Sequence, residues 1–362
     1  MEINGAKMFV KALQEEGVDT LFAYPGGTAI DLFDALYDAE GIDMILPRHE
    51  QALVHAADGY ARSTGRVGVC LVTSGPGATN LVTGIATANY DSVPLVCFTG
   101  QVPMNLIGND AFQEVDIVGI TRSICKYAVT VRKREDLARI IKNAFYIART
   151  GKPGPVVVDI PKDIQLAMGS DEYPTEVNIR GYKPSEGVHV GQIKRALAEL
   201  KNAKKPVFLC GGGVNIAHAR KEMQQLAEKT GIPVVTTIMG KGAIPTDHPL
   251  YVGNIGMHGN MASNKAIMES DVLFSIGCRF NDRITGTIDT FAKNAKIIHV
   301  DIDAASISRN IKVDIPIVAD AKVAISKMLE YAEPLDIKGW VDDIMNVKTE
   351  YLINMNRKDG GN

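Results

Sequence analysis

The chain has 362 residues, of which 46% are hydrophobic and 22% are charged, a balance typical of globular domains with an ample core. This length predicts two or three domains. The formal net charge of −3 argues against binding to nucleic acid or to an anionic membrane surface. No apolar run reaches the roughly 18 residues of a membrane span, and the amphipathic helix expected over 1–19 lacks the layout of a signal peptide. We therefore expect a cytoplasmic protein.

The five cysteines form no C-x-x-C pair, and their odd number prevents all of them from pairing with one another. Four of the five lie in apolar, strand-like runs. The pattern predicts buried, reduced thiols, as in other cytosolic proteins, and no zinc site. The residues are Cys70, Cys97, Cys125, Cys210 and Cys278.

The first half of the chain alternates between strand-like and helix-like patterns. One helix is expected over 50–65, where Gly65 stands in a C-cap position, and another over 81–92. The apolar run at 67–74 is continuous, which is the pattern of a strand buried on both faces. This order of elements predicts a parallel sheet with helices on both sides. Strands, some of them running into turns, are expected over 20–27, 42–48, 67–74, 93–100 and 153–161.

A polar segment with Pro and Gly, 166–190, interrupts the alternation and is interpreted as a linker. A second α/β unit follows, so the predicted fold is α/β with two doubly wound parallel-sheet domains, 1–165 and 191–332. Its helices are expected over 216–231 and 320–332. Its strands are expected over 205–215, 232–237, 270–278 and 296–303.

The remaining residues, 333–362, are predicted to form a truncated connecting tail with one amphipathic segment. Four large side chains fall on one face of this segment, namely Trp340, Ile344, Val347 and Tyr351.

Four Gly-rich turns follow strand-like runs, the positions where ligands bind in open α/β sheets. Each could equally be only a tight turn between a strand and a helix. None spells G-x-G-x-x-G or the P-loop, so neither a dinucleotide fingerprint nor a nucleoside triphosphatase is supported. Asp301 and Asp303 could reach a ribose hydroxyl or could simply end a strand. The turns are 24–27, 74–80, 210–215 and 253–260.

Glu50 is a lone carboxylate between Arg48–His49 and an apolar helix. If its carboxyl lies against apolar side chains, its pKa is raised and it can exchange a proton near neutral pH. If it is solvated at the start of the helix, it is only a favourable partner of the helix dipole. Local sequence leaves both interpretations open.

Several motifs together resemble the large, catalytic subunit of acetohydroxyacid synthase, also called acetolactate synthase, a family of thiamine-diphosphate transferases. Their order and spacing run without gaps from residue 1 to about residue 330, so the resemblance covers nearly the whole chain. The segments are FAYPGG (22–27), RHEQALVHAADGYAR (48–62), TSGPGATN (73–80), GNDAFQE (108–114), GKPGPVVVDIPKD (151–163), GNIGMHG (253–259) and GCRFNDRITG (277–286).

The resemblance implies that Glu50 hydrogen-bonds the aminopyrimidine ring of thiamine diphosphate and relays a proton to it. It implies decarboxylation of pyruvate and joining of the two-carbon unit to pyruvate or 2-ketobutyrate, in the biosynthesis of valine, leucine and isoleucine. Gly26 and Gly27 match the loop over the cofactor. Phe112, Gln113 and Lys162 match catalytic positions: the first two line the reaction site, and the lysine lies at the substrate entrance.

The resemblance also implies FAD as a second cofactor, bound mainly by the central domain and required without net redox work. Two positions depart from the family pattern: Lys152 replaces an Arg of many relatives, and Asn281 replaces a usual Asp; either change could weaken flavin binding. The positions matching flavin contacts are Lys152, Gly211, Gly212, Gly213, His258, Arg279, Asp301 and Asp320.

Family members also carry a further domain with a Gly-Asp-Gly motif that binds Mg²⁺ and the diphosphate. This sequence contains no Gly-Asp-Gly, so we expect no metal ligands here, Mg²⁺ only with that domain, and an incomplete chain that is inactive by itself. The alternatives are a split enzyme with a partner chain, or a non-catalytic flavin-binding remnant. Pyruvate oxidase and glyoxylate carboligase are the next related families, and the latter typically lacks the carboxylate found at Glu50. The resemblance also implies a homodimer with sites at its interface and, in many organisms, a small regulatory subunit.

Overall fold

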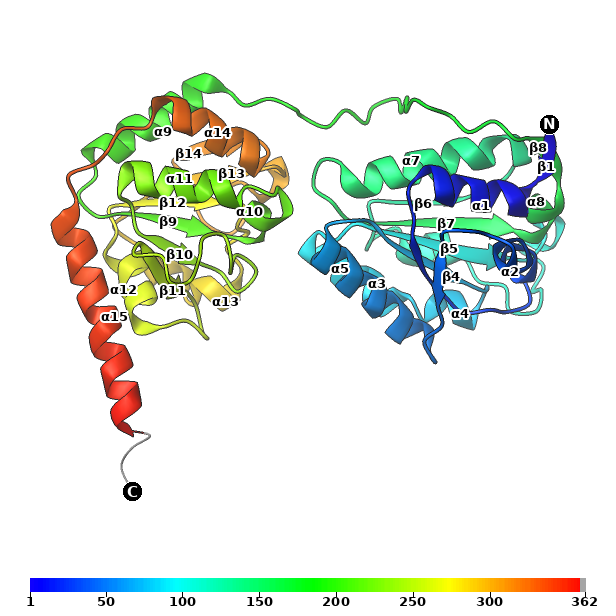
Figure 1. The fold of residues 1–362 in the computed structure, drawn as a ribbon, viewed down its shortest axis with the longest axis horizontal. Coiled ribbons are helices and arrows are strands. Elements are labelled where there is room, and N and C mark those ends of the chain that lie inside the picture. Colours follow the sequence, from blue (N-terminus) through cyan, green and yellow to red (C-terminus); the bar gives the residue numbers. More distant parts are fainter. Residues whose placement is uncertain (359–362) are drawn as a thin grey trace. The chain divides into compact units, whose positions relative to one another are not determined.

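In the computed structural model of this chain, residues 1–358 are described, with side chains up to residue 351. The chain forms two compact units, Met1–Pro184 and Ser185–Asn362 (Figure 1). Each unit is built on a six-stranded sheet, and every strand pairing in the two sheets is parallel. The predicted fold class, α/β with two doubly wound parallel sheets, is confirmed.

The sheet of unit 1 has the strand order β3-β2-β4-β5-β7-β6. Its strands are β2 (Thr20–Ala23), β3 (Asp43–Ile45), β4 (Gly68–Val72), β5 (Leu95–Gln101), β6 (Tyr127–Thr130) and β7 (Pro155–Pro161). Its helices are α1 (Gly5–Glu15), α2 (Ile30–Tyr37), α3 (Glu50–Thr64), α4 (Pro76–Thr79), α5 (Val82–Asp91), α6 (Ile117–Thr121), α7 (Leu137–Arg149) and α8 (Lys162–Leu166).

Successive residues of the central strands alternate between two apolar cores, one on each face of the unit 1 sheet. Val156 and Val158 of β7 join the core under α1 and α7, whereas Val157 joins the core under α3 and α5 (Figure 1). Because both faces are covered, these strands are apolar at consecutive positions, as their sequence predicted.

The predicted linker 166–190 is a connection only in part. Its residues Met168–Ser170 form strand β8, which pairs antiparallel with β1 (Glu2–Asn4). The buried guanidinium of Arg134 donates hydrogen bonds to the carbonyl oxygens of Ile3 at 3.0 Å and Ser170 at 3.2 Å. The first part of this polar segment therefore belongs to unit 1, because its backbone pairs with the start of the chain.

Unit 2 repeats this design with the strand order β11-β10-β9-β12-β13-β14. Its strands are β9 (Pro206–Cys210), β10 (Val234–Thr236), β11 (Tyr251–Asn254), β12 (Val272–Ile276), β13 (Lys296–Asp301) and β14 (Ile315–Val318). Helices α9 (Val190–Asn202), α11 (Arg220–Thr230) and α14 (Ala321–Tyr331) pack on one face, and α12 (Met261–Glu269) and α15 (Lys338–Lys358) on the other (Figure 1). Short helices α10 (Gly212–Ile216) and α13 (Asp282–Thr285) follow β9 and β12.

The segment predicted as a connecting tail contains helix α15, which packs on unit 2; its last residues, 359–362, lie outside the described part of the chain. Trp340 and Ile344 are buried in one core of that unit, and Val347 packs against the same core, so three of the four residues of the predicted apolar face lie as expected; Tyr351 is half-buried. The Trp340 indole donates a hydrogen bond to the carbonyl oxygen of Pro206 at 3.1 Å. This partner explains how the polar end of the indole is satisfied in a buried position.

All five cysteines are free thiols, and all but the half-buried Cys125 are buried, as predicted. Burial raises the pKa of the Cys125 thiol to about 11 and that of the Cys278 thiol to about 12. These thiols therefore stay protonated at neutral pH and make poor nucleophiles or metal ligands. Among the residues that the structure describes, no helix has both the length and the apolarity to cross a membrane.

Candidate cofactor sites

In each sheet the strand order reverses between two neighbouring strands, β2 and β4 in unit 1 and β9 and β12 in unit 2, and glycine-containing turns follow these four strands. In unit 1 the chain builds β3 on one side of β2 and then crosses to build β4 on the other side. In unit 2 the same reversal occurs between β9 and β12. At such a switch point the connections leave in opposite directions, which opens a crevice at the carboxyl ends of the strands. Both crevices are candidate ligand sites.

The turn after β2 in unit 1 fits closely against the end of β4. A Cβ atom on Gly26 would lie only 2.5 Å from Cβ of Thr73, so the backbone can approach this closely only because residue 26 is glycine. The hydroxyls of Thr28 and Thr73 lie 3.0 Å apart, and the backbone N–H of Ser74 donates to Thr28 Oγ1 at 3.1 Å. In contrast, a Cβ atom on Gly27 would meet no atom within 4 Å, so this glycine faces open space.

Glu50 is the first residue of α3 and is half-buried at the same sheet edge. Its Oε2 accepts a hydrogen bond from the amide of Asn80 at 2.9 Å, whereas Oε1 has no hydrogen-bond partner among the described residues. A Cβ atom on Gly77 would lie 3.5 Å from Oε1. The carboxylate is thus neither fully solvated nor sealed in an apolar pocket: one oxygen is held and the other remains available to a ligand.

The loop that carries Phe112 and Gln113 reaches the other end of the same glycine-rich segment. Gly75 has a φ of +55°, and a Cβ atom there would lie 2.5 Å from the carbonyl oxygen of Gln113. Gln113 itself has a φ of +58°, a conformation that non-glycine residues rarely adopt. Residues 75–80 therefore contact the backbone of Gln113 at one end, through Gly75, and the carboxylate of Glu50 at the other end, through Asn80. The Phe112 ring is 85% exposed.

Lys162, the first residue of α8, reaches the turn after β2 from the neighbouring strand end. Its Nζ donates to the carbonyl oxygen of Gly27 at 3.3 Å and lies 3.5 Å from Oδ2 of Asp31. The structure thus brings five predicted residues to the carboxyl edge of this sheet, and it leaves Lys152 out, because that residue precedes β7 at the opposite edge. The five are Gly26, Gly27, Glu50, Gln113 and Lys162.

Asn80 is the residue of this group that sequence reasoning missed. Its amide holds the carboxylate of Glu50 across 30 residues of sequence. The signal was present, since Asn80 ends the TSGPGATN motif, but only the folded chain shows which side chain it meets.

The unit 2 crevice is formed by two backbone turns in close contact. A Cβ atom on Gly211 would lie 2.1 Å from the carbonyl oxygen of Gly277, and one on Gly213 would lie 2.6 Å from its Cα atom. Gly277 follows β12 with a φ of +63°. The two turns can therefore pack this closely only because these positions are glycine.

The other flavin positions predicted in unit 2 also follow strand ends, so they share this edge. Arg279 follows β12, and His258 is exposed after β11. Asp301 ends β13 and accepts the backbone N–H of Asp303 at 2.9 Å. Asp320 follows β14, where it caps α14 by accepting the N–H of Lys322 at 2.8 Å and that of Val323 at 3.2 Å. Its carboxylate therefore already has a structural role.

His299 of β13 is a further residue that sequence reasoning did not single out. It is fully buried, and neither ring nitrogen has a hydrogen-bond partner among the described residues. Its Nε2 lies 3.7 Å from Oδ2 of Asp301, and its ring packs edge-on to Phe280 at 5.0 Å between centroids.

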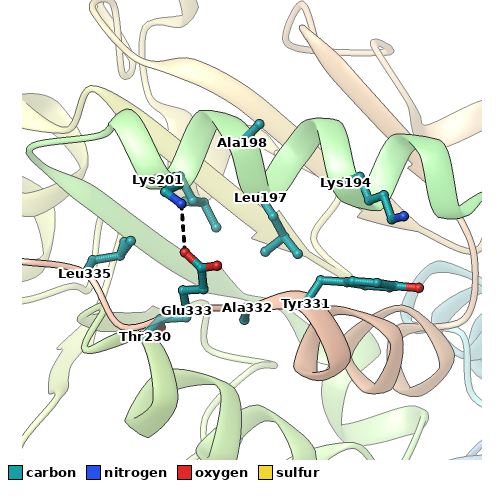
Figure 2. Close-up of a pocket in the computed structure, with 10 residues that line it drawn as sticks. Lys194, Leu197, Ala198, Lys201, Thr230, Tyr331, Ala332, Glu333 and Leu335 are labelled. Carbon is teal, nitrogen blue, oxygen red and sulfur yellow. Dashed lines mark hydrogen bonds and ion pairs between the residues drawn. The ribbon is translucent and has the colours of Figure 1, made fainter.

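A separate cavity of about 230 Å³ opens on unit 2 beside α9 and the end of α14 (Figure 2). Leu197 contributes to its apolar lining, and Lys201 donates to Glu333 at 2.9 Å. Lys194 Nζ lies 4.8 Å from the ring centroid of Tyr331. None of the predicted cofactor residues lines this cavity, which is smaller than the roughly 300–1,000 Å³ of most ligand pockets. We assign no cofactor to it.

Comparison with known protein families now defines the class. Residues 3–120 match the N-terminal TPP binding domain of thiamine pyrophosphate enzymes, and residues 193–328 match the central domain of the same enzymes. The chain therefore belongs to the thiamine pyrophosphate enzymes, and each matched domain lies in one of the two structural units.

Within that class, the chain is a homologue of acetolactate synthase large subunits. It is 49% identical to the probable acetolactate synthase large subunit of Methanococcus aeolicus over 99% of this chain and 62% of that protein. It is 47% identical to the acetolactate synthase large subunit of Haemophilus influenzae, over 99% of this chain and 64% of the relative. It is 48% identical to the acetolactate synthase isozyme 3 large subunit of Escherichia coli, over 94% of this chain and 61% of that protein. The chain thus spans a little under two thirds of the length of these relatives.

Proposed function

We propose that this chain takes part in acetolactate synthesis by supplying the pyrimidine side of a thiamine diphosphate site and a flavin-binding domain. The reaction is the decarboxylation of pyruvate and transfer of the two-carbon unit to pyruvate or 2-ketobutyrate, on the route to branched-chain amino acids. The observation that carries the proposal is the position of Glu50: its carboxylate lies at the switch-point edge of unit 1, with one oxygen held by Asn80 and the other available.

The residues at this edge fit the aminopyrimidine ring of the cofactor. Such a ring presents a basic nitrogen, which an available carboxyl oxygen can hydrogen-bond, and Gly27 leaves open space beside the turn. When bound, thiamine diphosphate supplies a carbon nucleophile and stores the electron pair released by decarboxylation. Glu50 would hold the proton that the ring nitrogen shares, and Asn80 would fix the orientation of that carboxyl.

Two further residues supply polar groups for the substrate. Lys162 Nζ places a positive charge beside the turn after β2, where the carboxylate of a 2-keto acid would be attracted, although Asp31 offsets part of that charge. Gln113 offers an amide on a strained backbone, and such strain often accompanies a functional position. The exposed ring of Phe112 would cover the apolar part of the substrate.

The pyrimidine-binding role can be tested by saturation-transfer NMR with thiamine diphosphate, Mg²⁺ and the 362-residue chain. Wild type should saturate the pyrimidine protons more strongly than the thiazolium protons. Glu50→Ala should lower the pyrimidine signal at least about fivefold, because one charged hydrogen bond is worth about 1.5–3 kcal/mol. The exposed Glu15 on α1 provides the matched control, Glu15→Ala. Equal signals from Glu50→Ala and wild type would reject the proposed site.

We also propose that unit 2 binds FAD in the crevice at the carboxyl ends of β9 and β12. The close-packed glycine turns leave the sheet edge open to a dinucleotide, and Arg279 and Asp301 provide groups for phosphate and ribose hydroxyls. Arg279→Leu should weaken FAD binding about tenfold in a titration of flavin fluorescence. Arg195→Leu, at an exposed position on α9, should leave it unchanged. If both variants bind FAD like wild type, Arg279 is not a flavin contact.

The same proposal extends to assembly and location. Exposed apolar side chains on and beside edge strand β3, Met44, Ile45 and Leu46, support a homodimer. The relatives are named large subunits, which supports a small regulatory partner. The oxygen ligands for Mg²⁺ would come from a further domain of the kind that carries the Gly-Asp-Gly motif. The five free cysteines, four of them buried, support a cytoplasmic location.

A further inference from the structure

Unit 1 contains a buried carboxylate for which the proposed chemistry gives no use. Asp159 of β7 is 2% exposed. Its Oδ1 accepts the hydroxyl of Thr99 at 2.6 Å. Its Oδ2 accepts the amide of Gln101 and the hydroxyl of Thr130, both at 3.2 Å. Burial raises the pKa of Asp159 to about 6, against the effect of these three hydrogen bonds. An apolar residue would fill this strand position at lower cost, so the polar cluster calls for an explanation.

Gln101 connects this carboxylate to the loop that carries Phe112 and Gln113. It is the last residue of β5 and is 3% exposed. The same amide nitrogen that donates to Asp159 also donates to the carbonyl oxygen of Val115 at 3.0 Å. Its side-chain oxygen accepts the backbone N–H of Val102 at 2.9 Å. The loop 102–116 leaves the sheet directly after Gln101, and the same buried side chain ties the far end of the loop back to the sheet at Val115.

Other contacts shape this loop but do not replace that anchor. The carboxylate of Glu114 accepts the N–H groups of Gly108 at 2.5 Å and Ala111 at 3.3 Å, so these bonds stay within the loop. Asp163 accepts the N–H of Met104 at 3.1 Å, near the beginning of the loop. At its far end, the bond from Gln101 meets Val115, two residues after Gln113.

We propose that Asp159 and Gln101 form a positioning pair that sets where the loop 102–116 holds Gln113 against Gly75. The carboxylate orients the Gln101 amide, the amide fixes Val115, and the short span to Gln113 then keeps its backbone at the glycine-rich segment beside Glu50. That Gln113 faces substrate rests on the proposed function; the anchoring of the loop does not.

The test is site-resolved hydrogen exchange of the full chain, comparing wild type with Gln101→Met. Methionine keeps the volume of glutamine but removes the hydrogen bonds to Asp159, Val115 and Val102. The loop amides of Leu106, Asn109 and Glu114 should exchange about tenfold faster, because a buried hydrogen bond and its orientation are lost. Asp159→Val should raise exchange at the same amides by a smaller factor.

Two controls separate positioning from general loss of stability. Val157→Ala, a buried neighbour on β7, should destabilise unit 1 without changing the ratio of loop exchange to strand exchange. Thr130→Val removes one bond to Asp159 but keeps Gln101, so the loop should behave as in wild type. If Gln101→Met raises loop exchange no more than Val157→Ala does, the proposal is overturned. If loop exchange rises but Gln113→Ala leaves pyruvate binding unchanged, the positioning pair stands and the assigned role of Gln113 fails.

Discussion

At the scale of single residues, two carboxylates of unit 1 show which site residues can be predicted from the sequence and which cannot. Glu50 stood out because it interrupts apolar residues at the start of a predicted helix. Asp159 did not stand out, because it lies in an apolar strand and its partners come from two other strands. Asn80 was missed because its partner, Glu50, lies 30 residues away in sequence. A sequence motif therefore points to a candidate site residue such as Glu50 more readily than to a distant residue that hydrogen-bonds it, such as Asn80.

The buried charge of Asp159 should make stability depend on pH. Its pKa rises from 3.8 to about 6 on folding, so between about pH 4 and pH 6 the folded state holds more protons than the unfolded state. The free energy of unfolding therefore falls as the pH rises through this window, by up to about 3 kcal/mol from this group. Asp159→Asn should remove this contribution. Urea unfolding followed by circular dichroism should show that the difference in free energy of unfolding between wild type and Asp159→Asn changes between pH 4 and pH 7.

The exposed Asp343 provides a control, since Asp343→Asn should follow wild type at every pH. Stability curves of wild type and Asp159→Asn that run parallel from pH 4 to pH 7 would show that Asp159 does not titrate as described.

At the scale of elements, the sequence predicted the strands in long apolar runs and the helix end at Gly65 correctly. It did not predict the short elements. Helix α3 begins at Glu50 and is closed by Gly65 with a φ of +73°, as predicted. The expected helix 216–231 begins only at Arg220, as α11, because the chain turns at His218, whose φ is +51°; Ile216 instead ends the short helix α10. Strand β8 was assigned to a linker because so short a strand carries no periodicity. Its pairing depends on β1 and Arg134, both far away in sequence.

Helix α15 should contribute substantially to the stability of unit 2. Ile344 is 2% exposed, so Ile344→Ala should lower the free energy of unfolding by about 2–4 kcal/mol through lost burial and a cavity. The single tryptophan of the chain, Trp340, lies one helical turn away and reports unfolding of this unit by its fluorescence. Asp343→Ala, on the exposed side of the same helix, should change the free energy of unfolding by less than about 0.5 kcal/mol. Similar losses in both variants would show that α15 is not packed as described.

At the scale of the whole molecule, each unit uses the same solution: a parallel sheet whose order reverses between two adjacent strands, with glycine turns at the reversal. The order of strands and helices predicted the two α/β units. The position of the reversals could not be read from that order, because they depend on which strands pair. The resemblance named the residues, and the topology explains why residues from separate motifs meet at one sheet edge.

We propose that Glu50 shares a proton with the aminopyrimidine ring of thiamine diphosphate. This proton transfer can be followed through the exchange rate of the thiazolium carbon proton of bound cofactor, measured by NMR after rapid mixing with D₂O. Glu50→Gln keeps the size of the side chain and a hydrogen bond to Asn80 but cannot relay a proton, so exchange should slow at least about a hundredfold. Exchange as fast in Glu50→Gln as in wild type would contradict the assignment of Glu50 and the account built on it.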